Sequence, residues 1–278
     1  MTLPNFLVIG AQRSGTSWLH QNLRNHVEIY LSKKRKEIHY FDRYYERSLK
    51  WYESFFPSES ESKNYKWVGE ITPRYIFEPE VPERIYQTIP DCKFIVILRN
   101  PADRAYSNYG LKVRNKAYRK SFLEYLAEHP EAFEKGLYAE QLERYLQYFQ
   151  LDQFLILIFE ETIKNPQQAF EKIFKFLSLD STKYSENFQK EKVNSSYIVK
   201  HAKSYTLIRN FVTWIRKNDL DWVFNTAKRL GVSKYIFGNA GQLPKIDSQI
   251  KQKLLADYEK DIQSLERLIQ IDLSFWRQ

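Results

Sequence analysis

The sequence has little cysteine and no long apolar run. Cys92 is the single cysteine among 278 residues, which excludes an internal disulfide. Because it lies just before the apolar run KFIVILR, we expect a buried, inert thiol, and a reducing compartment fits this usage. No run of about eighteen apolar residues occurs, and the start MTLPNFLVIGAQ lacks the length and charge of a secretory signal. We therefore expect a soluble, cytoplasmic protein without a membrane span.

The sequence also lacks internal repeats, low-complexity tracts and linkers rich in glycine or proline. A chain of this length can bury most of its apolar surface around one core, so we expect residues 1–278 to form a single domain. Acidic residues are fewer than basic ones, 34 against 43, which gives a net charge of +9. A surface of that sign favours anionic partners such as nucleotides, sulfated or phosphorylated sugars, nucleic acids and anionic lipids.

A lysine is missing from the segment GAQRSGTSW at residues 10–18. A nucleoside-triphosphate loop reads G-x-x-x-x-G-K-[ST]; here Gly10 and Gly15 have that separation, but Thr16 stands at the lysine position. The segment lies between a predicted strand and a predicted helix, whose unpaired N–H groups and dipole favour an anion. Arg13 adds a positive charge. The hydroxyl donors are Ser14, Thr16 and Ser17. A capped turn is the alternative, but the combination favours a phosphate site.

Apolar runs rich in β-branched and aromatic residues indicate buried parallel strands at 6–10, 93–99 and 154–159, with a weaker candidate at 67–71. Helical patterns occupy 16–25, 47–56, 79–88, 102–117, 137–149 and 166–177. This alternation predicts an α/β fold, a three-layer P-loop-like arrangement with a central parallel sheet flanked by helices. After about residue 190 we expect no further strand, but helical sequence over 205–230 and a long helix over 249–269 that docks on the core.

A second candidate phosphate site is ILRNPADRAYSNY, residues 97–109. Arg99 stands at the carboxyl end of a predicted strand, the edge where open α/β sheets bind ligands, and Ser107 follows in the next helix. An arginine there can bind a phosphate that a serine hydroxyl also contacts. A surface ion pair for Arg99 and a solvated helix face for Ser107 are the alternatives. Together with the loop, the pair suggests a nucleotide phosphorylated at two separate positions.

The third candidate is KKRKEIHYFD, residues 33–42. Four basic residues in succession usually form a solvated loop, and a single histidine is more often structural than catalytic. Here Glu37, His39 and Asp42 lie beside that charge and are flanked by aromatic residues. A carboxylate among cations and rings can act as a general base.

These segments resemble those of the PAPS-dependent sulfotransferases, and within them the heparan sulfate 3-O- and N-sulfotransferase branch. LVIGAQRSGTSWL is similar to the family's 5′-phosphosulfate loop, and VILRNPADRAYSNY to its 3′-phosphate motif. KEIHYFD resembles the Glu-x-His-Phe-Phe-Asp segment that carries the catalytic glutamate. Shorter similarities lie at 70–77, 136–149, 159–166 and 271–276.

The resemblance implies that the donor is 3′-phosphoadenylyl sulfate (PAPS). It has no γ-phosphate, so the missing lysine would have nothing to hold. The donor-binding residues implied are Arg13, Ser14, Gly15, Thr16, Ser17, Trp18, Arg99 and Ser107. Glu37 would act as general base toward an acceptor hydroxyl or amine, and His39 and Asp42 would orient the glutamate or the acceptor. Arg13 would stabilise charge on the leaving oxygen. This mechanism requires no metal.

The sequence departs from the family pattern in three places. Many relatives have lysine at the position of Arg13, and because arginine does not readily give up a proton, we expect electrostatic help rather than proton donation. Ile71 replaces a lysine that lies near the acceptor in heparan-type relatives, which argues against a heparan-like acceptor. Their carboxy-terminal cysteine pair and nucleotide loop are absent. Candidates for a replacement loop are Lys200, His201 and Lys203, with a solvated loop as the alternative.

The region 205–245 is rich in Trp, Phe and Tyr and matches no family segment. We expect a helical insertion that shapes the pocket of a small-molecule or carbohydrate acceptor, with a helical pair packed on the sheet as the alternative. Apolar walls suit a lipid-like, polyketide or aromatic alcohol as well as a sugar. The resemblance implies no nucleic-acid partner, and the missing anchor and disulfide favour a soluble, bacterial enzyme.

Two other functions stay open at this point. One is a P-loop kinase that acts with Mg-ATP, in which Glu160 or Glu161 of FLILIFEE would replace the acidic strand end that such enzymes use to hold magnesium. The other is a non-enzymatic protein that binds polyanions with a steep salt dependence.

Overall fold

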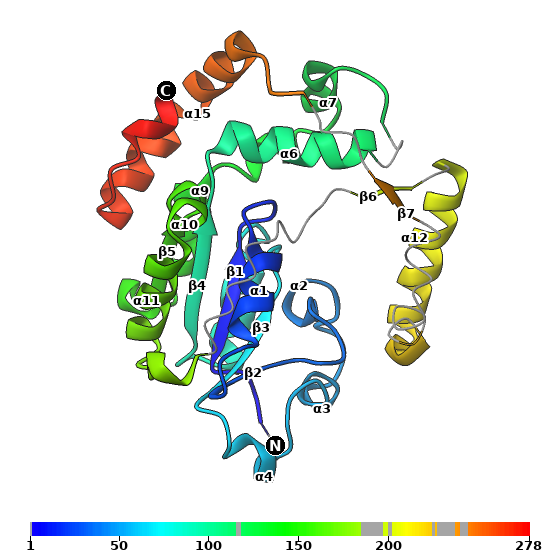
Figure 1. Ribbon diagram of the computed structural model, residues 1–278, viewed down its shortest axis with the longest axis vertical. Helices are drawn as coiled ribbons and strands as arrows, with labels where there is room; N and C mark the ends of the chain where they lie inside the picture. Colours follow the sequence, from blue (N-terminus) through cyan, green and yellow to red (C-terminus); the bar gives the residue numbers. More distant parts are fainter. Residues whose placement is uncertain are drawn as a thin grey trace.

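The computed structural model describes residues 2–114, 118–184, 197–199, 202–223, 226, 237–239 and 244–278. Its centre is a five-stranded sheet in which every neighbouring pair of strands is parallel, in the order β2-β3-β1-β4-β5 (Figure 1). The strands are β1 Phe6–Gly10, β2 Ile29–Leu31, β3 Trp67–Ile71, β4 Lys93–Leu98 and β5 Phe154–Ile158. The predicted α/β class with a central parallel sheet is confirmed.

The sheet is covered on both faces because consecutive side chains of its strands are apolar, so that both faces are apolar. Leu7 and Ile9 of β1 point to one face, where they pack in a core that includes the buried sides of α5, α6, α9 and α15. Phe6 and Val8 point to the other face, in a core that includes α1 and α11. Strands that are apolar on both faces are typical of parallel sheets between two layers of helices. This arrangement confirms the predicted three layers.

Most long helices lie in the predicted segments. They are α1 Thr16–Leu23, α5 Val81–Thr88, α6 Pro101–Arg114, α9 Tyr138–Leu146, α11 Pro166–Phe176, α12 Ala202–Lys217 and α15 Ser248–Ile269. Shorter helices connect them. These are α2 Tyr40–Arg43, α3 Leu49–Glu53, α4 Glu59–Ser62, α7 Phe122–Glu128, α8 Glu131–Glu134 and α10 Phe159–Lys164, with 3-10 turns at Leu151–Gln153, Ser181–Lys183 and Ser274–Arg277. Within the described residues, no helix has the length and apolarity needed to cross a membrane.

Three sequence-based expectations about strands were wrong. β2 was not predicted, and the expected absence of strands after about residue 190 fails because β6 Tyr197–Val199 and β7 Phe237–Asn239 pair antiparallel. Strands of three residues are too short for a periodic pattern to reveal them. Phe159, placed in a strand by its apolar neighbours, instead begins α10. Of the region 205–245, most residues after 223 lie outside the described residues.

The carboxy-terminal region docks on one sheet face, as predicted. Helix α15 lies against α9 and α6, with Leu254, Tyr258 and Ile262 buried. Beyond it, the Trp276 side chain is buried and its indole Nε1 donates to Glu160 at 3.2 Å. The Asn100 side chain donates to the Trp276 carbonyl at 2.8 Å. The end of the chain therefore supports the residue that follows Arg99 at the carboxyl end of β4.

Candidate functional site

The candidate site lies at one edge of the sheet, where the carboxyl ends of the parallel strands meet. The loop 11–15 follows β1, Arg99 follows β4 and the segment 32–39 follows β2. Strand β1 lies between β3 and β4, so the chain order reverses beside it, and such switch points are where open α/β sheets bind ligands. The unpredicted strand β2 brings the Glu37 segment to the same edge as the phosphate loop.

The phosphate loop turns sharply through left-handed backbone conformations. Gly15 has φ 88° and Arg13 has φ 72°. A β-carbon on Gly15 would lie 3.1 Å from the Phe159 ring, so glycine meets both the positive φ and the close contact. Gly15 caps α1, and no side chain caps its first turn. The first-turn N–H groups and the positive end of the helix dipole are therefore directed at the loop, as in known anion sites.

Arg13, Arg99 and Ser107 converge beside this loop. The Arg13 Nε donates to the Ser107 hydroxyl at 3.2 Å, and the Arg99 Nη1 donates to the Arg13 carbonyl at 3.0 Å. The Arg99 guanidinium lies over the Phe159 ring, 4.8 Å from its centroid. The predicted second phosphate site is thus directly joined to the loop.

Two buried polar atoms at this edge have no hydrogen-bond partner among the described residues, Ser14 Oγ and Arg99 Nε. A buried unsatisfied donor costs about 1–3 kcal/mol. Phosphate or sulfate oxygens accept hydrogen bonds from such groups. These atoms therefore fit an anionic ligand with acceptor oxygens at both the loop and the β4 end.

His39 joins two carboxylates in the segment after β2. Its Nδ1 lies 2.9 Å from Asp42 Oδ2 and its Nε2 lies 3.4 Å from Glu37 Oε2. The Asp42 side chain is 1% exposed and that of Glu37 is 35% exposed. Asp42 therefore holds the imidazole, while Glu37 remains accessible to an acceptor.

The charges around Glu37 keep it ionised. Burial alone would raise its pKa, but hydrogen bonds from His39 and Lys36 and their positive charges lower the pKa to about 2. Burial disfavours the charged form of His39 as well and by itself would lower its pKa. The hydrogen bonds to Asp42 and Glu37 outweigh burial, so the pKa of His39 is raised. The pair therefore consists of a carboxylate and an imidazole that binds its proton more tightly than usual.

Lys36 is a site residue that the sequence analysis did not single out. Its Nζ donates to the Ser17 hydroxyl at 3.0 Å and lies 3.5 Å from Glu37 Oε1. It therefore connects the first turn of α1 with the candidate base. The run of basic residues at 33–36 had indicated a solvated loop, because sequence alone does not show that this segment follows a strand of the central sheet.

A buried hydrogen-bond network centred on Glu70 supports the turn at His39. The Glu70 carboxylate on β3 accepts hydrogen bonds from Tyr52 at 2.6 Å, Thr72 at 2.5 Å and Tyr75 at 2.8 Å. The Tyr75 hydroxyl in turn accepts from the Phe41 backbone N–H at 3.3 Å. Burial raises the pKa of Glu70 despite these bonds. The network fixes the backbone immediately after His39.

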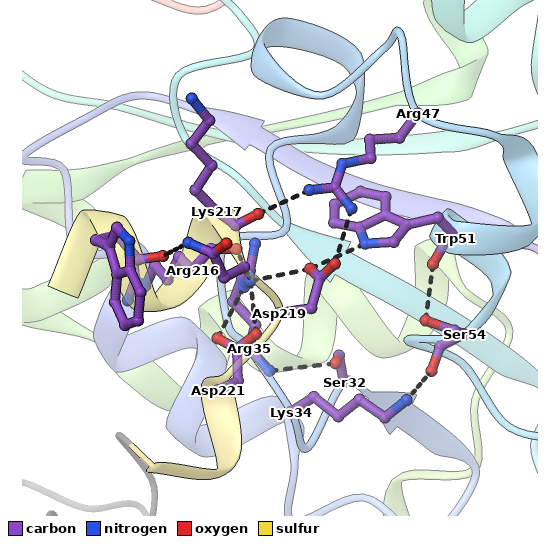
Figure 2. A network of polar contacts seen from close by, with 12 residues as sticks. Ser32, Lys34, Arg35, Arg47, Trp51, Ser54, Arg216, Lys217, Asp219 and Asp221 are labelled. Carbon is purple, nitrogen blue, oxygen red and sulfur yellow. Dashed lines mark hydrogen bonds and ion pairs between the residues drawn. The ribbon is translucent and has the colours of Figure 1, made fainter. Parts of the chain in front are cut away.

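A second network ties the same segment to the end of α12, as Figure 2 shows. The buried Arg35 guanidinium bonds both Asp221 oxygens, at 3.0 and 2.5 Å, and the Arg216 carbonyl at 3.0 Å. Asp219 bonds Arg47 at 2.7 Å and the Trp51 indole at 3.0 Å. Arg35 stands two residues before Glu37 in the sequence. Its contacts therefore join residues 216–221 to the segment that carries Glu37.

The remaining predicted residues have more ordinary surroundings. Thr16 is buried in α1, and the Trp18 ring packs edge-on against Phe170 at 5.5 Å. Lys203 lies in the first turn of α12, and its side chain is outside the description. Lys200 and His201 lie outside the described residues.

The two carboxylates named for the kinase alternative differ in their surroundings. Glu160 accepts from the Asn100 backbone N–H at 2.9 Å and from the Trp276 indole. Glu161 is more than half exposed, 3.9 Å from Lys172. Within the parts of the chain that the structure covers, no group of three or more His, Cys, Asp or Glu side chains is arranged to hold a metal ion. Glu160 thus supports the carboxyl end of β4 through Asn100.

Comparison with known proteins agrees with this geometry. The chain is 33% identical over 193 residues to human heparan sulfate glucosamine 3-O-sulfotransferase 6, with 66% of the chain and 55% of that protein covered. It is 38% identical over 130 residues to the membrane-associated sulfotransferase kil1 of Dictyostelium discoideum, covering 46% of the chain and 27% of that protein. The chain thus spans about half or less of the length of these relatives.

A solved structure, a sulfotransferase from Alicyclobacillus acidocaldarius, aligns over 100% of both chains with 25% identity and a TM-score of 0.67. The family model described as "Sulfotransferase domain" matches residues 3–221, more than half of the 278-residue chain. The chain therefore belongs to the sulfotransferase domain family.

Proposed function

We propose that the protein transfers a sulfuryl group from PAPS to an acceptor hydroxyl, with Glu37 as general base. The observation that carries this proposal is the junction of two candidate anion sites at one sheet edge, where Arg13 donates to Ser107 and Arg99 donates to the Arg13 carbonyl. A nucleotide with phosphates at two separate positions matches such a pair. Family membership supports the same donor.

The donor would lie across the two sites. The amides of loop 11–15 and the hydroxyls of Ser14, Thr16 and Ser17 would bind its 5′ end. Arg99 and Ser107 would bind the 3′ phosphate, with Arg13 between the two ends. Once bound, PAPS supplies an activated sulfuryl group.

The base would act from the segment after β2. Glu37 takes the proton of the acceptor hydroxyl, whose oxygen forms the new bond to sulfur as the bond from sulfur to the nucleotide breaks. With its pKa lowered to about 2, Glu37 is ionised at all physiological pH values. His39 and Asp42 fix its position by the contacts described above. Neither role requires a metal.

The acceptor is proposed as a small-molecule or carbohydrate alcohol. Ile71 is buried in the core, so β3 presents no cation at that position for an acidic sugar. The end of α12 lies against the Glu37 segment, and its described side chains include the exposed rings of Phe211 and Trp214. We propose that these rings contribute to the acceptor pocket, which would then suit an acceptor with an apolar part. The cytoplasmic location, the single domain and the role of Lys203 stay predictions.

Thermal unfolding with added nucleotides tests the donor site. Adenosine 3′,5′-bisphosphate (PAP) should raise the melting temperature without magnesium, because a ligand of the folded state stabilises it. Arg99→Ala should remove most of that shift. A larger shift with ATP and magnesium would favour the kinase alternative, and equal, strongly salt-dependent shifts with unrelated polyanions would favour the polyanion binder.

The Glu37→Gln variant tests the base. It should keep the melting shift with PAP and lose sulfate transfer by about 10²–10⁴-fold, the usual contribution of a general base. Mass spectrometry of a panel of alcohols, which detects the gain of one sulfonate group from PAPS, measures transfer. Sulfate transfer by the Glu37→Gln variant would indicate that His39 rather than Glu37 is the general base.

A further inference from the structure

The cation inside the phosphate loop is turned toward the second anion site. Arg13 Nε donates to Ser107 on α6, the residue proposed to bind the 3′ phosphate. Arginine also keeps its proton under all ordinary conditions. The Arg13 Nε–H is therefore directed at the proposed 3′-phosphate site.

Lys36 is held on the opposite side, between the loop helix and the base. Its ammonium bonds Ser17 in the first turn of α1, whose N–H groups face the 5′ end of the proposed donor. The same ammonium lies 3.5 Å from Glu37, which would receive the acceptor proton. The sulfuryl group passes from the 5′ end of the donor to the acceptor. It must therefore cross the region between Ser17 and Glu37, where the Lys36 ammonium lies.

The ammonium also has donor capacity for this group. A lysine ammonium has three N–H donors. Within the described residues, two of them are directed at Ser17 and Glu37, and the Lys36 side chain is 24% exposed. One donor is therefore left for an oxygen of a ligand in this region.

We infer that Lys36 binds the sulfuryl oxygens during transfer and donates a hydrogen bond to the oxygen that leaves sulfur, an inference that rests on the proposed function. As the acceptor oxygen bonds to sulfur, the electron pair of the breaking sulfur–oxygen bond remains on the 5′ phosphate of PAP. The Lys36 ammonium offsets this added charge and keeps its proton. Glu37 holds the proton of the acceptor.

The binding test uses PAPS and PAP, because they differ only in the sulfuryl group. Lys36→Met should reduce the melting shift with PAPS more than the shift with PAP, so that the difference between the two ligands disappears. Arg99→Ala should reduce both shifts together. Lys33→Met is the matched control, since Lys33 lies in the same segment over the Tyr30 ring and should leave both shifts unchanged.

Turnover with an alcohol from the panel gives the second readout. Lys36→Met should lower kcat by about 10²–10³-fold, the usual effect of removing one donor to a developing charge. Lys36→Arg should retain part of the activity. In the wild type, kcat should fall at alkaline pH as Lys36 loses its proton, because burial lowers the pKa of Lys36 although Glu37 opposes this effect. Arginine at this position should remove that fall.

The groups that face Lys36 are Glu37 in its own segment and Ser17 on α1, with His39 behind Glu37. If a His39→Gln variant keeps the alkaline fall in kcat, the fall is due to Lys36. If the variant loses the fall, it is due to His39, and this part of the inference is overturned. If the wild type binds PAP and transfers sulfate but Lys36→Met does so equally well, the inference fails and the proposed function stands. If the wild type binds neither PAPS nor PAP, the proposed function itself fails.

Discussion

At the scale of the residue, the imidazole of His39 determines how charge is arranged beside the base. It has a left-handed backbone with φ 63°, which directs its ring between Asp42 and Glu37. A protonated ring satisfies both carboxylates, whereas a neutral ring can donate to only one of them. The protonation state of His39 is therefore coupled to the stability of the site.

The first prediction concerns this coupling. The folded-state pKa of His39 is raised above its ordinary value of 6.5. Its charged bonds therefore contribute full stability below about pH 6.5 and lose that contribution as the pH rises through the raised pKa. His39→Gln should cost about 1.5–3 kcal/mol at low pH, the usual value of bonds to charged groups. The difference in melting temperature from the wild type should shrink as the pH rises above about 6.5 and through the raised pKa of His39.

The control for this prediction is His129→Gln. His129 is 34% exposed and lies 3.4 Å from the exposed Glu131, so its removal should change the melting temperature little. A His39→Gln effect that stays constant across the pH range would contradict the coupling.

At the scale of the element, the turn after α12 is joined to the segment that carries Glu37. Arg35 is buried and depends on Asp221 for its two-oxygen contact, while Asp219 lies at the surface with a side chain 40% exposed (Figure 2). Breaking a buried pair costs far more than breaking an exposed one, because the remaining charge loses both water and partner.

The second prediction follows from this difference. Asp221→Asn should lower the free energy of unfolding by up to about 3–5 kcal/mol. It should also increase amide hydrogen exchange over residues 210–223 and reduce turnover more than PAP binding. Asp219→Asn is the matched control, because asparagine tolerates the left-handed φ of 57° there, Asp219 lies 4.0 Å from Arg35, and its closer pair with Arg47 is exposed and contributes about 1 kcal/mol or less. Equal effects of the two variants would rule out the anchoring role of Arg35.

At the scale of the whole molecule, the carboxy-terminal end completes the sheet edge. The Trp276 ring is 1% exposed, its indole bonds Glu160 after β5, and its carbonyl receives the Asn100 side chain after β4. The last residues therefore link the ends of β4 and β5, and Arg99 of the candidate donor site follows β4.

The third prediction concerns this link. Trp276→Ala should cost about 3–5 kcal/mol of stability, the usual loss for a buried aromatic side chain, and should weaken PAP binding because Asn100 is next to Arg99. Chemical denaturation and the melting shift with PAP measure the two effects. Trp222→Ala serves as control, because Trp222 is 66% exposed and its loss should change stability by less than about 0.5 kcal/mol. Unchanged PAP affinity in a folded Trp276→Ala variant would contradict the link.

The sequence by itself determined the features that depend on neighbouring residues. Continuous apolar runs identified β1 and β4, and two glycines with a basic residue and hydroxyls identified the loop before α1. Arg99 and Ser107 were found as candidates because they follow such a run, and Glu37 because it lies among basic and aromatic residues in a segment that resembles a family motif. These signals are local, since periodicity, turn residues and helix starts reflect interactions within a few residues.

Only the tertiary structure decided which candidates meet and which residues join them. Strand β2 lies at the far edge of the sheet, beside β3, and its position brings Lys36 to Ser17; Arg13 faces Ser107, and Glu160 supports Trp276. These contacts join segments that are far apart in the chain. They depend on strand order and on the packing of helices over both sheet faces, which arise from the burial of the whole core and leave no pattern in any single segment.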